Sequence, residues 1–245
     1  MTYLVEVKNL KKNYTSKEAV KNISFNIKEN EILGLLGPNG SGKTTTIGML
    51  LGLLKPSSGE IKIDNMSFEK NRIEILSKIN FISPYIELPK KLTVKQNLII
   101  YGKLYNVENL TERIKYLTEQ LRLEDLLNRV TGELSSGQKN RASLAKALIN
   151  KPKVLFLDEP TASLDPEIGD FVRSFLENYK KENKISVLLA SHNMNEVSRL
   201  CKSVLMMKNG LIIDEGTPKF LIEKHGRKNL EEVFLKLSRG ENEFN

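Results

Sequence analysis

The sequence contains a single cysteine, Cys201, among its 245 residues. An intrachain disulfide and a cysteine-based metal cluster are therefore excluded, and this composition fits exposure to the cytosol. We expect Cys201 to be a small buried apolar residue. Long apolar runs are equally scarce: the longest, Ile47 to Leu54, includes two glycines and is less than half the length needed to span a membrane. If the protein acts at a membrane, another chain must cross it.

Several other features are missing. No basic stretch followed by an apolar run opens the sequence, so we expect no signal peptide. Internal repeats and low-complexity segments are also lacking. The formal charge is +8 and the pI is about 9.3, but the lysines form only pairs such as Lys11-Lys12 and Lys90-Lys91. We therefore expect no basic groove and no nucleic-acid partner. Apolar residues at 40% and charged residues at 28% indicate an ordinary globular protein.

Short strands alternate with helical segments along most of the chain. Strands are expected at residues 3–7, 19–27, 31–36, 59–64, 153–158 and 185–190, and at 204–207 and 211–214 around an Asn209-Gly210 hairpin turn. Residues 8–16 are polar and predict turns. Helices are expected from the 37–45 segment to about 54, through most of 69–150, and at 166–181, 194–201 and 221–237, with 238–245 frayed. This alternation predicts an α/β fold with a mostly parallel sheet and an inserted helical subdomain.

A glycine-rich segment joins the strand at 31–36 to the helix that follows it. It has the P-loop pattern, in which backbone amides and the helix N-terminus cradle phosphates. In this pattern Lys43 neutralises the β- and γ-phosphates and the Thr44 hydroxyl coordinates Mg²⁺. The alternative, a glycine-rich turn with a chance lysine, does not explain the strand before it and the helix after it. The predicted nucleotide-binding residues are Gly37, Pro38, Asn39, Gly40, Ser41, Gly42, Lys43, Thr44 and Thr45.

A second motif follows the apolar run Val154 to Leu157. This strand delivers Asp158 and Glu159 at its carboxyl end, where ligands bind in parallel sheets. Asp158 is placed to hold Mg²⁺, directly or through water, and Glu159 to polarise the attacking water. An acidic pair at a strand end is common by itself, but a P-loop in the same chain favours the functional interpretation.

The segment Leu134-Ser135-Ser136-Gly137-Gln138 precedes a predicted helix. By itself it could be a helix N-cap. The chain here resembles the ABC (ATP-binding cassette) ATPase family, whose hallmark sequence is LSGGQ; Ser136 replaces the first glycine. A serine hydroxyl, a glycine amide and a helix N-terminus together suit an anion. The resemblance implies that Ser135, Ser136, Gly137 and Gln138 reach the ATP held by a partner subunit, so that hydrolysis requires a dimer.

Three further positions match the family in the same order. Residues 160–166 resemble the D-loop, in which Asp165 contacts across the dimer; the local alternative is an N-cap with Pro166 at the first helical position. His192 matches the switch histidine that senses the γ-phosphate, and the alternative is a capping or surface histidine. Tyr14 matches the aromatic residue that stacks on adenine. The resemblance covers about residues 3–215.

One departure from the family concerns a glutamine between the P-loop and the helical insert. In the family it contacts Mg²⁺ and the reactive water and links the site to the membrane partner. Residues 81–87 of this chain contain no glutamine, and alignment from residues 92–94 places Ser83 or Pro84 there. Ser83 still supplies a hydroxyl, whereas Pro84 has neither a side-chain donor nor an amide hydrogen. We expect slower hydrolysis or a different coupling to transport.

The resemblance implies a P-loop NTPase core with an N-terminal antiparallel β region. We expect one ABC ATPase domain at 1–238, with a core at about 1–84 and 151–215, a helical subdomain at about 85–150, and a C-terminal helical tail at 216–245. Residues 229–237 are similar to the ending of ATPase subunits of ABC-2-type exporters. The implied function is ATP hydrolysis that powers such an exporter, with ATP and Mg²⁺ bound.

The implied partners are a separate transmembrane permease and a second ABC ATPase subunit, either another copy or a paralogue. The chain would then lie peripherally on the cytoplasmic face of the cell membrane. Two alternatives stay open: a soluble ABC ATPase that moves no solute, and a regulator that binds ATP without hydrolysing it. The missing glutamine favours the regulator, and the presence of Glu159 and His192 disfavours it.

Overall fold

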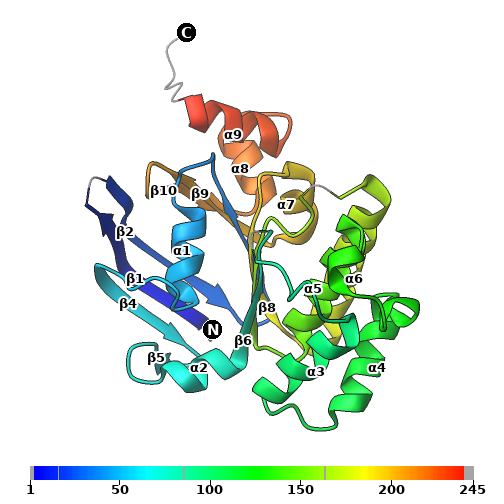
Figure 1. Cartoon of the computed structure of the whole chain (residues 1–245). Helices are drawn as coiled ribbons and strands as arrows, with labels where there is room; N and C mark the ends of the chain where they lie inside the picture. Colours follow the sequence, from blue (N-terminus) through cyan, green and yellow to red (C-terminus); the bar gives the residue numbers. More distant parts are fainter. Residues whose placement is uncertain (1–2, 16, 85, 163, 240–245) are drawn as a thin grey trace. The chain divides into compact units, whose positions relative to one another are not determined.

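A computed structural model describes residues 3–15, 17–84, 86–162 and 164–239 of the chain. It divides into two compact units, which we call unit 1 (Met1–Ile75 and Ser186–Asn245) and unit 2 (Leu76–Ile185). Figure 1 follows the chain from the N-terminal strands through the helical middle to the C-terminal helices. Unit 1 is thus built from both ends of the sequence, and unit 2 from one continuous stretch.

The first sheet of unit 1 is antiparallel. Its strand order is β2-β1-β4-β5, and the strands are β1 (Tyr3–Tyr14), β2 (Lys17–Lys28), β4 (Ser58–Ile63) and β5 (Met66–Ser67). The turn predicted over residues 8–16 is wrong for most of its length, because β1 continues to Tyr14 and pairs with β2 throughout. The register shifts on both sides of Leu10, and Asn9 has φ 50°. These bulges admit polar residues without ending the strand.

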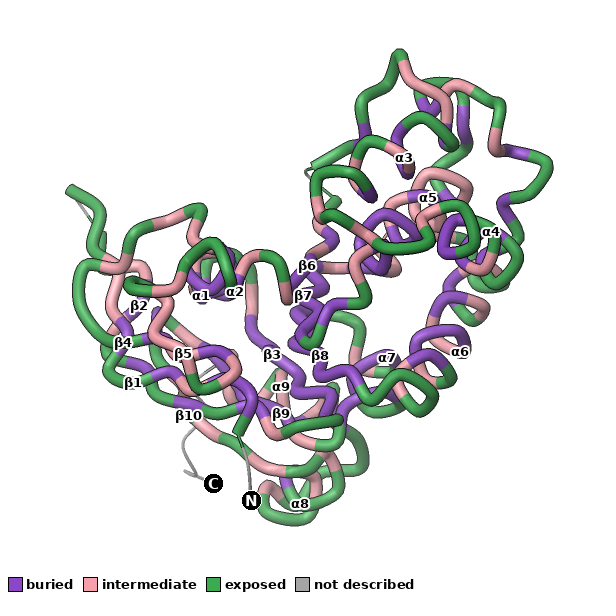
Figure 2. Tube along the Cα trace, turned by 90° about the horizontal axis from the view of Figure 1, so that it is seen from below, coloured by how far each residue is buried: buried purple, intermediate pink, exposed green. Residues whose placement is uncertain are grey.

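The second group of strands in unit 1 surrounds β3 (Ile32–Leu36). Strand β3 is parallel both to β8 (Ser186–Ala190) and to β9 (Ser203–Lys208), and β9 forms an antiparallel hairpin with β10 (Leu211–Gly216). Every residue of β3 and β8 is buried (Figure 2), as expected for parallel strands. Four helices of this unit are α1 (Lys43–Leu50), α7 (Met194–Leu200), α8 (Pro218–Lys224) and α9 (Leu230–Arg239). Cys201, directly after α7, is buried as predicted.

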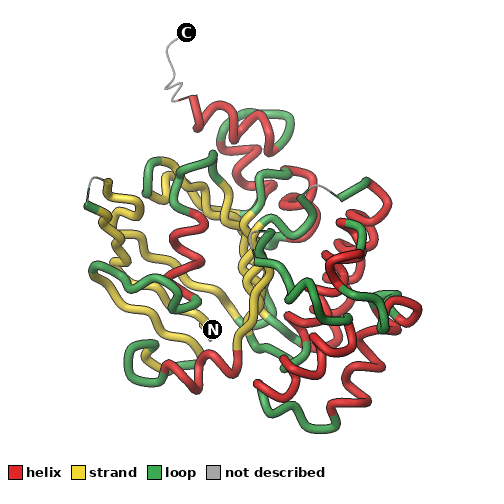
Figure 3. The backbone as a smooth tube through the Cα atoms, viewed as in Figure 1, coloured by secondary structure: helices red, strands yellow, loops and turns green. Residues whose placement is uncertain are grey.

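Unit 2 is mainly helical (Figure 3) around two short parallel strands, β6 (Ile79–Ile82) and β7 (Val154–Asp158). Helix α2 (Arg72–Lys78) leads into it, and its own helices are α3 (Val94–Leu104), α4 (Leu110–Gln120), α5 (Ser136–Leu148) and α6 (Pro166–Asn183). Two single 3₁₀ turns, at Glu124–Leu126 and Thr131–Glu133, precede α5. The prediction of helices through most of 69–150 missed β6, which begins at Ile79. The structure thus contains the parallel strands, the antiparallel N-terminal sheet and the helices that the predicted α/β fold requires.

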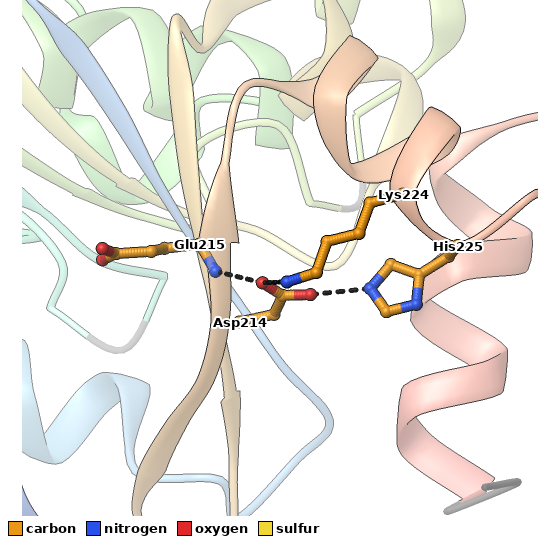
Figure 4. A network of polar contacts seen from close by, with 4 residues as sticks. All are labelled: Asp214, Glu215, Lys224 and His225. Carbon is orange, nitrogen blue, oxygen red and sulfur yellow. Dashed lines mark hydrogen bonds and ion pairs between the residues drawn. The ribbon is translucent and has the colours of Figure 1, made fainter.

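The C-terminal segment contains two helices rather than the single helix predicted at 221–237. Gly226, at φ 60°, ends the first of them by adopting a left-handed conformation. A buried carboxylate holds this segment to β10: Asp214 accepts hydrogen bonds from Lys224 (2.7 Å) and the amide of Glu215 (2.8 Å), and His225 Nε2 lies 2.6 Å from its other oxygen (Figure 4). Burial acts to raise the pKa of Asp214, but these hydrogen bonds outweigh it and hold the pKa below its usual value. The predicted frayed end at 240–245 lies outside the described residues.

Candidate functional site

The glycine-rich loop of unit 1 leaves the end of β3 and enters α1. Gly42 is the N-cap of α1 at φ 110°, and a Cβ on it would lie 2.7 Å from the carbonyl oxygen of Ala19. Only glycine fits there, because both the backbone angle and the space exclude a side chain. Gly42 makes no side-chain cap hydrogen bond, and the N-terminus of a helix is a place where backbone amides and the helix dipole favour an anion.

Two side chains of this loop are suited to phosphate. The ammonium of Lys43 is buried and donates to the carbonyl oxygens of Gly37 (2.7 Å) and Pro38 (3.3 Å), which holds it at the loop. The hydroxyl of Ser41 is buried and has no hydrogen-bond partner among the residues that the structure describes. A buried hydroxyl without a partner costs free energy unless a ligand satisfies it. Thr44, in the first turn of α1, is exposed.

The β9–β10 hairpin, which is distant in the sequence, supports this loop through backbone hydrogen bonds. The amide of Gly210 donates to the carbonyl of Ser41 (2.9 Å), and its own carbonyl accepts from the amide of Lys21 (2.7 Å). Asn209 and Gly210 both have positive φ, as a two-residue hairpin turn requires. The sequence predicted the hairpin but not its contact with the loop, because the sequence pattern of the turn says nothing about what packs beside it.

His192 lies between β8 and α7. Its side chain is exposed, while the neighbouring Ser191 donates to the buried carboxylate of Glu196 (2.6 Å) and accepts from the amide of Asn193 (3.1 Å). Asn193 in turn caps α7. Sequence reasoning missed Glu196 as a support, and the only available hint was an acidic residue in the first turn of a helix. Tyr14 is also exposed, at the end of β1, and the ammonium of Lys12 lies 5.1 Å from its ring centre.

In unit 2 the acidic pair stands where β7 ends. Asp158 is the last residue of the strand and is buried, with 3% of its surface exposed. Glu159 follows at φ 51°, in the left-handed region that a non-glycine residue rarely adopts. Such strain is retained where the position of a side chain matters more than its cost.

The segment at 135–138 is the start of α5. Ser135 and Gln138 form a capping box, in which the hydroxyl oxygen of Ser135 accepts from the amide of Gln138 (3.3 Å) and the Gln138 side chain accepts from the amide of Ser135 (3.0 Å). Ser136 is exposed, and a Cβ on the buried Gly137 would lie 3.3 Å from Ile168 of α6. The segment is therefore a helix N-cap, as the alternative interpretation predicted. A capped N-terminus does not conflict with anion binding, because the amides of the first turn of α5 point out of the same end of the helix.

Asp165 is likewise an N-cap, whose carboxylate accepts from the amide of Ile168 (2.9 Å), with Pro166 at the first helical position. Of the D-loop stretch, Ser163 lies outside the described residues. A cavity of about 180 Å³ in unit 2 is lined by residues of several motifs: Ser83, Pro84, Ser136 and Glu159 are among them. The structure therefore brings the start of α5, the residues that replace the family glutamine, and Glu159 together within one unit.

The predicted site residues fall into two groups by unit. Unit 1 carries Tyr14, the loop at 37–45 and His192, and unit 2 carries Asp158, Glu159, Ser135 to Gln138 and Asp165. The available oxygen ligands fit Mg²⁺, which binds through one or two carboxylates together with phosphates and water. No group of three or more histidine, cysteine or acidic side chains with metal-site geometry occurs in the described part of the chain. Within those same ranges, no helix is long and apolar enough to cross a membrane.

Comparison with known proteins gives concordant matches. Residues 20–162 match the family model described as "ABC transporter". The chain is 36% identical over 227 residues to the ABC transporter ATP-binding protein NatA of Bacillus subtilis, covering 91% of this chain and 92% of that one. It is 34% identical over 232 residues to a Nod factor export ATP-binding protein I of Burkholderia orbicola, covering 94% and 76%. A dimeric ATP-binding cassette in a post-hydrolysis state with ADP and Pi superimposes with a TM-score of 0.81 at 28% identity, covering 87% of this chain and 98% of that one.

Proposed function

The chain belongs to the ABC transporter family, as an ATP-binding subunit that hydrolyses ATP, and we propose that it powers export through a separate transmembrane permease. Support for export comes from the similarity to a Nod factor export protein and from the ending at 229–237. The proposal includes a peripheral position on the cytoplasmic face of the membrane and a working dimer with a second ABC ATPase subunit. It also includes one cassette at 1–238 with a helical subdomain at about 85–150 and a helical tail at 216–245.

In unit 1, nucleotide binding rests on the loop at 37–45. Its amides and the N-terminus of α1 hold phosphate oxygens, and the ammonium of Lys43 leaves the carbonyls of Gly37 and Pro38 to neutralise the β- and γ-phosphates. Tyr14, exposed at the end of β1, stacks on the adenine ring. His192 contacts the γ-phosphate and senses its loss; the Ser191–Glu196 hydrogen bond fixes the backbone from which it projects.

Thr44 and Asp158 would hold Mg²⁺, which when bound neutralises the phosphate charge that develops during transfer. Thr44 offers an exposed hydroxyl, and the buried Asp158 offers a carboxylate. Burial of Asp158 limits its movement and keeps water from competing for it.

The observation that carries the catalytic proposal is the backbone of Glu159. Glu159 directly follows a fully buried strand, which holds its backbone in place, and it has a φ of 51° that a non-glycine residue rarely adopts. Its carboxylate acts as the base that orients the attacking water and takes its proton. The bond between the γ-phosphorus and the β–γ bridging oxygen of ATP breaks, and that oxygen keeps the electron pair and leaves as part of ADP. Ser135 to Gln138 and Asp165 act on the nucleotide of the partner subunit.

The Glu159→Gln variant tests this assignment. Glutamine keeps the size of the side chain but cannot accept the proton, so we expect turnover to fall roughly 100-fold or more with ATP affinity retained and an ATP-bound dimer trapped. Size-exclusion chromatography with ATP would detect the dimer. Glu119→Gln, on the exposed face of α4, is the matched control. Turnover of Glu159→Gln within a few-fold of the native rate would refute the role of Glu159.

The export proposal has a separate test in the source cell. The chain should co-purify with membranes, and this association should be lost when a neighbouring gene for a chain with about six apolar helices is deleted. Persistent recovery in the soluble fraction with such a permease present would contradict export and favour an ABC ATPase that moves no solute.

A further inference from the structure

Lys146 is a buried lysine in the last turn of α5, with 9% of its surface exposed. Its ammonium donates to the carbonyl oxygen of Phe81 (3.2 Å), at β6, and lies 4.8 Å from the ring centre of Phe81 and 5.5 Å from that of Tyr101. Lysine is rarely buried because its charge must be desolvated, and a methionine would fill this space at lower cost. A charged side chain retained in an aromatic pocket therefore needs an explanation beyond packing.

Phe81, to which Lys146 donates its hydrogen bond, lies on β6, the strand paired with β7. Phe81 is paired with Phe156 and Ile82 with Leu157 in the parallel β6–β7 ladder, and β7 continues into Asp158 and Glu159. After Ile82 the chain enters Ser83 and Pro84, which replace the family glutamine. Pro84 has no amide hydrogen to donate, and the Ser83 carbonyl accepts from the amide of Ile86 (3.2 Å), so the way in which the end of β6 is held contributes to the position of this segment.

Ser83 and Pro84 line the same cavity of unit 2 as Ser136 and Glu159. We infer that Lys146 is a positioning residue for ATP hydrolysis: it fixes the end of β6 against α5 and thereby sets the distance of Ser83 and Pro84 from Glu159. In this chain the lysine restrains a segment that lacks the glutamine side chain. The inference rests on the proposed role of Glu159, which the Glu159→Gln variant tests independently of Lys146.

The contact depends on charge. A protonated amine is attracted to both rings and to the Phe81 carbonyl, and loss of the proton removes the cation–π component. Burial lowers the pKa of Lys146 to about 8. Of the elements packed against Lys146, α3 places the ionisable Tyr101 beside it. Residues 79–82 of β6 contain no ionisable side chain. Arg113 of α4 binds the carbonyls of Leu148 and Ile149, which follow Lys146 in the sequence.

The experiment compares Lys146→Met, Lys146→Arg and the control Lys103→Met, an exposed lysine of α3, in the full chain. Turnover, ATP affinity and melting temperature are measured for each. For Lys146→Met we expect kcat to fall roughly 10-fold, since a small misplacement is enough to slow a reaction strongly, with ATP affinity within about 2-fold. The melting temperature should change by no more than about 3 °C, because removing a buried charge offsets the lost hydrogen bond. Lys103→Met should match the native chain.

Two outcomes of this comparison would overturn the inference. One is a kcat of Lys146→Met within about 3-fold of the native value, because a misplaced segment is expected to lower kcat by roughly 10-fold. The other is a loss of kcat that accompanies a large fall in melting temperature, which would make Lys146 merely structural.

The pH profile separates charge from size. The kcat of the native chain should decline as the pH rises through about 8. Lys146→Arg, whose guanidinium stays charged, should have at pH 7.5 the activity that Lys146→Met lacks, and should keep it to higher pH. Identical pH profiles for the native chain and Lys146→Arg would refute the dependence on the Lys146 charge.

Discussion

Arg113 of α4 offers a sharp test of how unit 2 is held together. Its guanidinium is buried and donates to the carbonyls of Leu148 (2.5 Å) and Ile149 (3.4 Å) and to the hydroxyl oxygen of Tyr179 (2.6 Å). The two carbonyls belong to the C-terminal end of α5, which lacks intrahelical donors and carries the negative end of the helix dipole. One side chain of α4 thus binds the C-terminal end of α5 and a tyrosine side chain of α6.

The substitution Arg113→Met keeps most of the apolar volume and removes the donors. Three buried acceptors lose a partner, at about 1–3 kcal/mol each, and relief from burying the charge offsets several kcal/mol. We expect a net loss of about 2–4 kcal/mol in the free energy of unfolding. For a chain of this length that corresponds to a fall in melting temperature of roughly 5–15 °C.

Urea unfolding followed by circular dichroism measures this loss, with Arg129→Met, at an exposed arginine, as the control. Tyr179→Phe alone should cost about 1 kcal/mol and should cost almost nothing when added to Arg113→Met, because the hydrogen bond is then already absent. Burial raises the pKa of Tyr179, so the hydroxyl stays neutral throughout this experiment. A loss below about 0.5 kcal/mol for Arg113→Met, or full additivity of the two substitutions, would refute the reasoning.

Two further predictions concern unit 1. Gly42→Ala should weaken ATP binding at least about 10-fold by isothermal calorimetry, because an added Cβ would collide with the backbone of Ala19. Gly40→Ala, at φ 77° with no atom within 4 Å of an added Cβ, should cost only the backbone strain of about 1 kcal/mol. Equal effects of the two substitutions would contradict the packing argument. Asp214→Asn should lower stability at pH 7 by about 1–3 kcal/mol. Because the pKa of Asp214 is lowered in the folded chain, its stabilisation is present above the unfolded value of about 3.9 and is lost as the pH falls through the folded pKa. A native-minus-variant difference in urea unfolding that stays constant from pH 7 to pH 3 would contradict this sign.

The motif residues could be predicted from the sequence because their chemistry fixes residue type and order. Gly42 must be glycine in its left-handed conformation, and Asp158 must stand at the end of a buried strand. By contrast, β6 was missed because Ile73, Leu76 and Ile79 have helical spacing and the strand that begins at Ile79 has only four residues. A short apolar run does not distinguish the two structures.

Other features depend on contacts between residues that are distant in the sequence. The burial of Lys146 could not be predicted, since a lysine is expected at the surface and its pocket is made by Phe81 and Tyr101 from other elements. The left-handed backbone of Glu159 is likewise set by its surroundings rather than by residue type. In β1, the polar residues after Val7 predicted a turn, but pairing with β2 overrides that local preference.

Because β3 pairs with β8 and β9, we expect ATP binding to become possible only late in synthesis on the ribosome. β3 is made early, but its parallel partners begin only at Ser186 and Ser203, and Gly210, whose amide holds the glycine-rich loop, is made later still. Unit 2 ends at Ile185, so its whole sequence is made before β8, β9 and Gly210 and it can fold first. The glycine-rich loop can be held in place only after Gly210 has been made. A nascent chain that stops before the β9–β10 hairpin should contain all nine loop residues and yet bind no ATP.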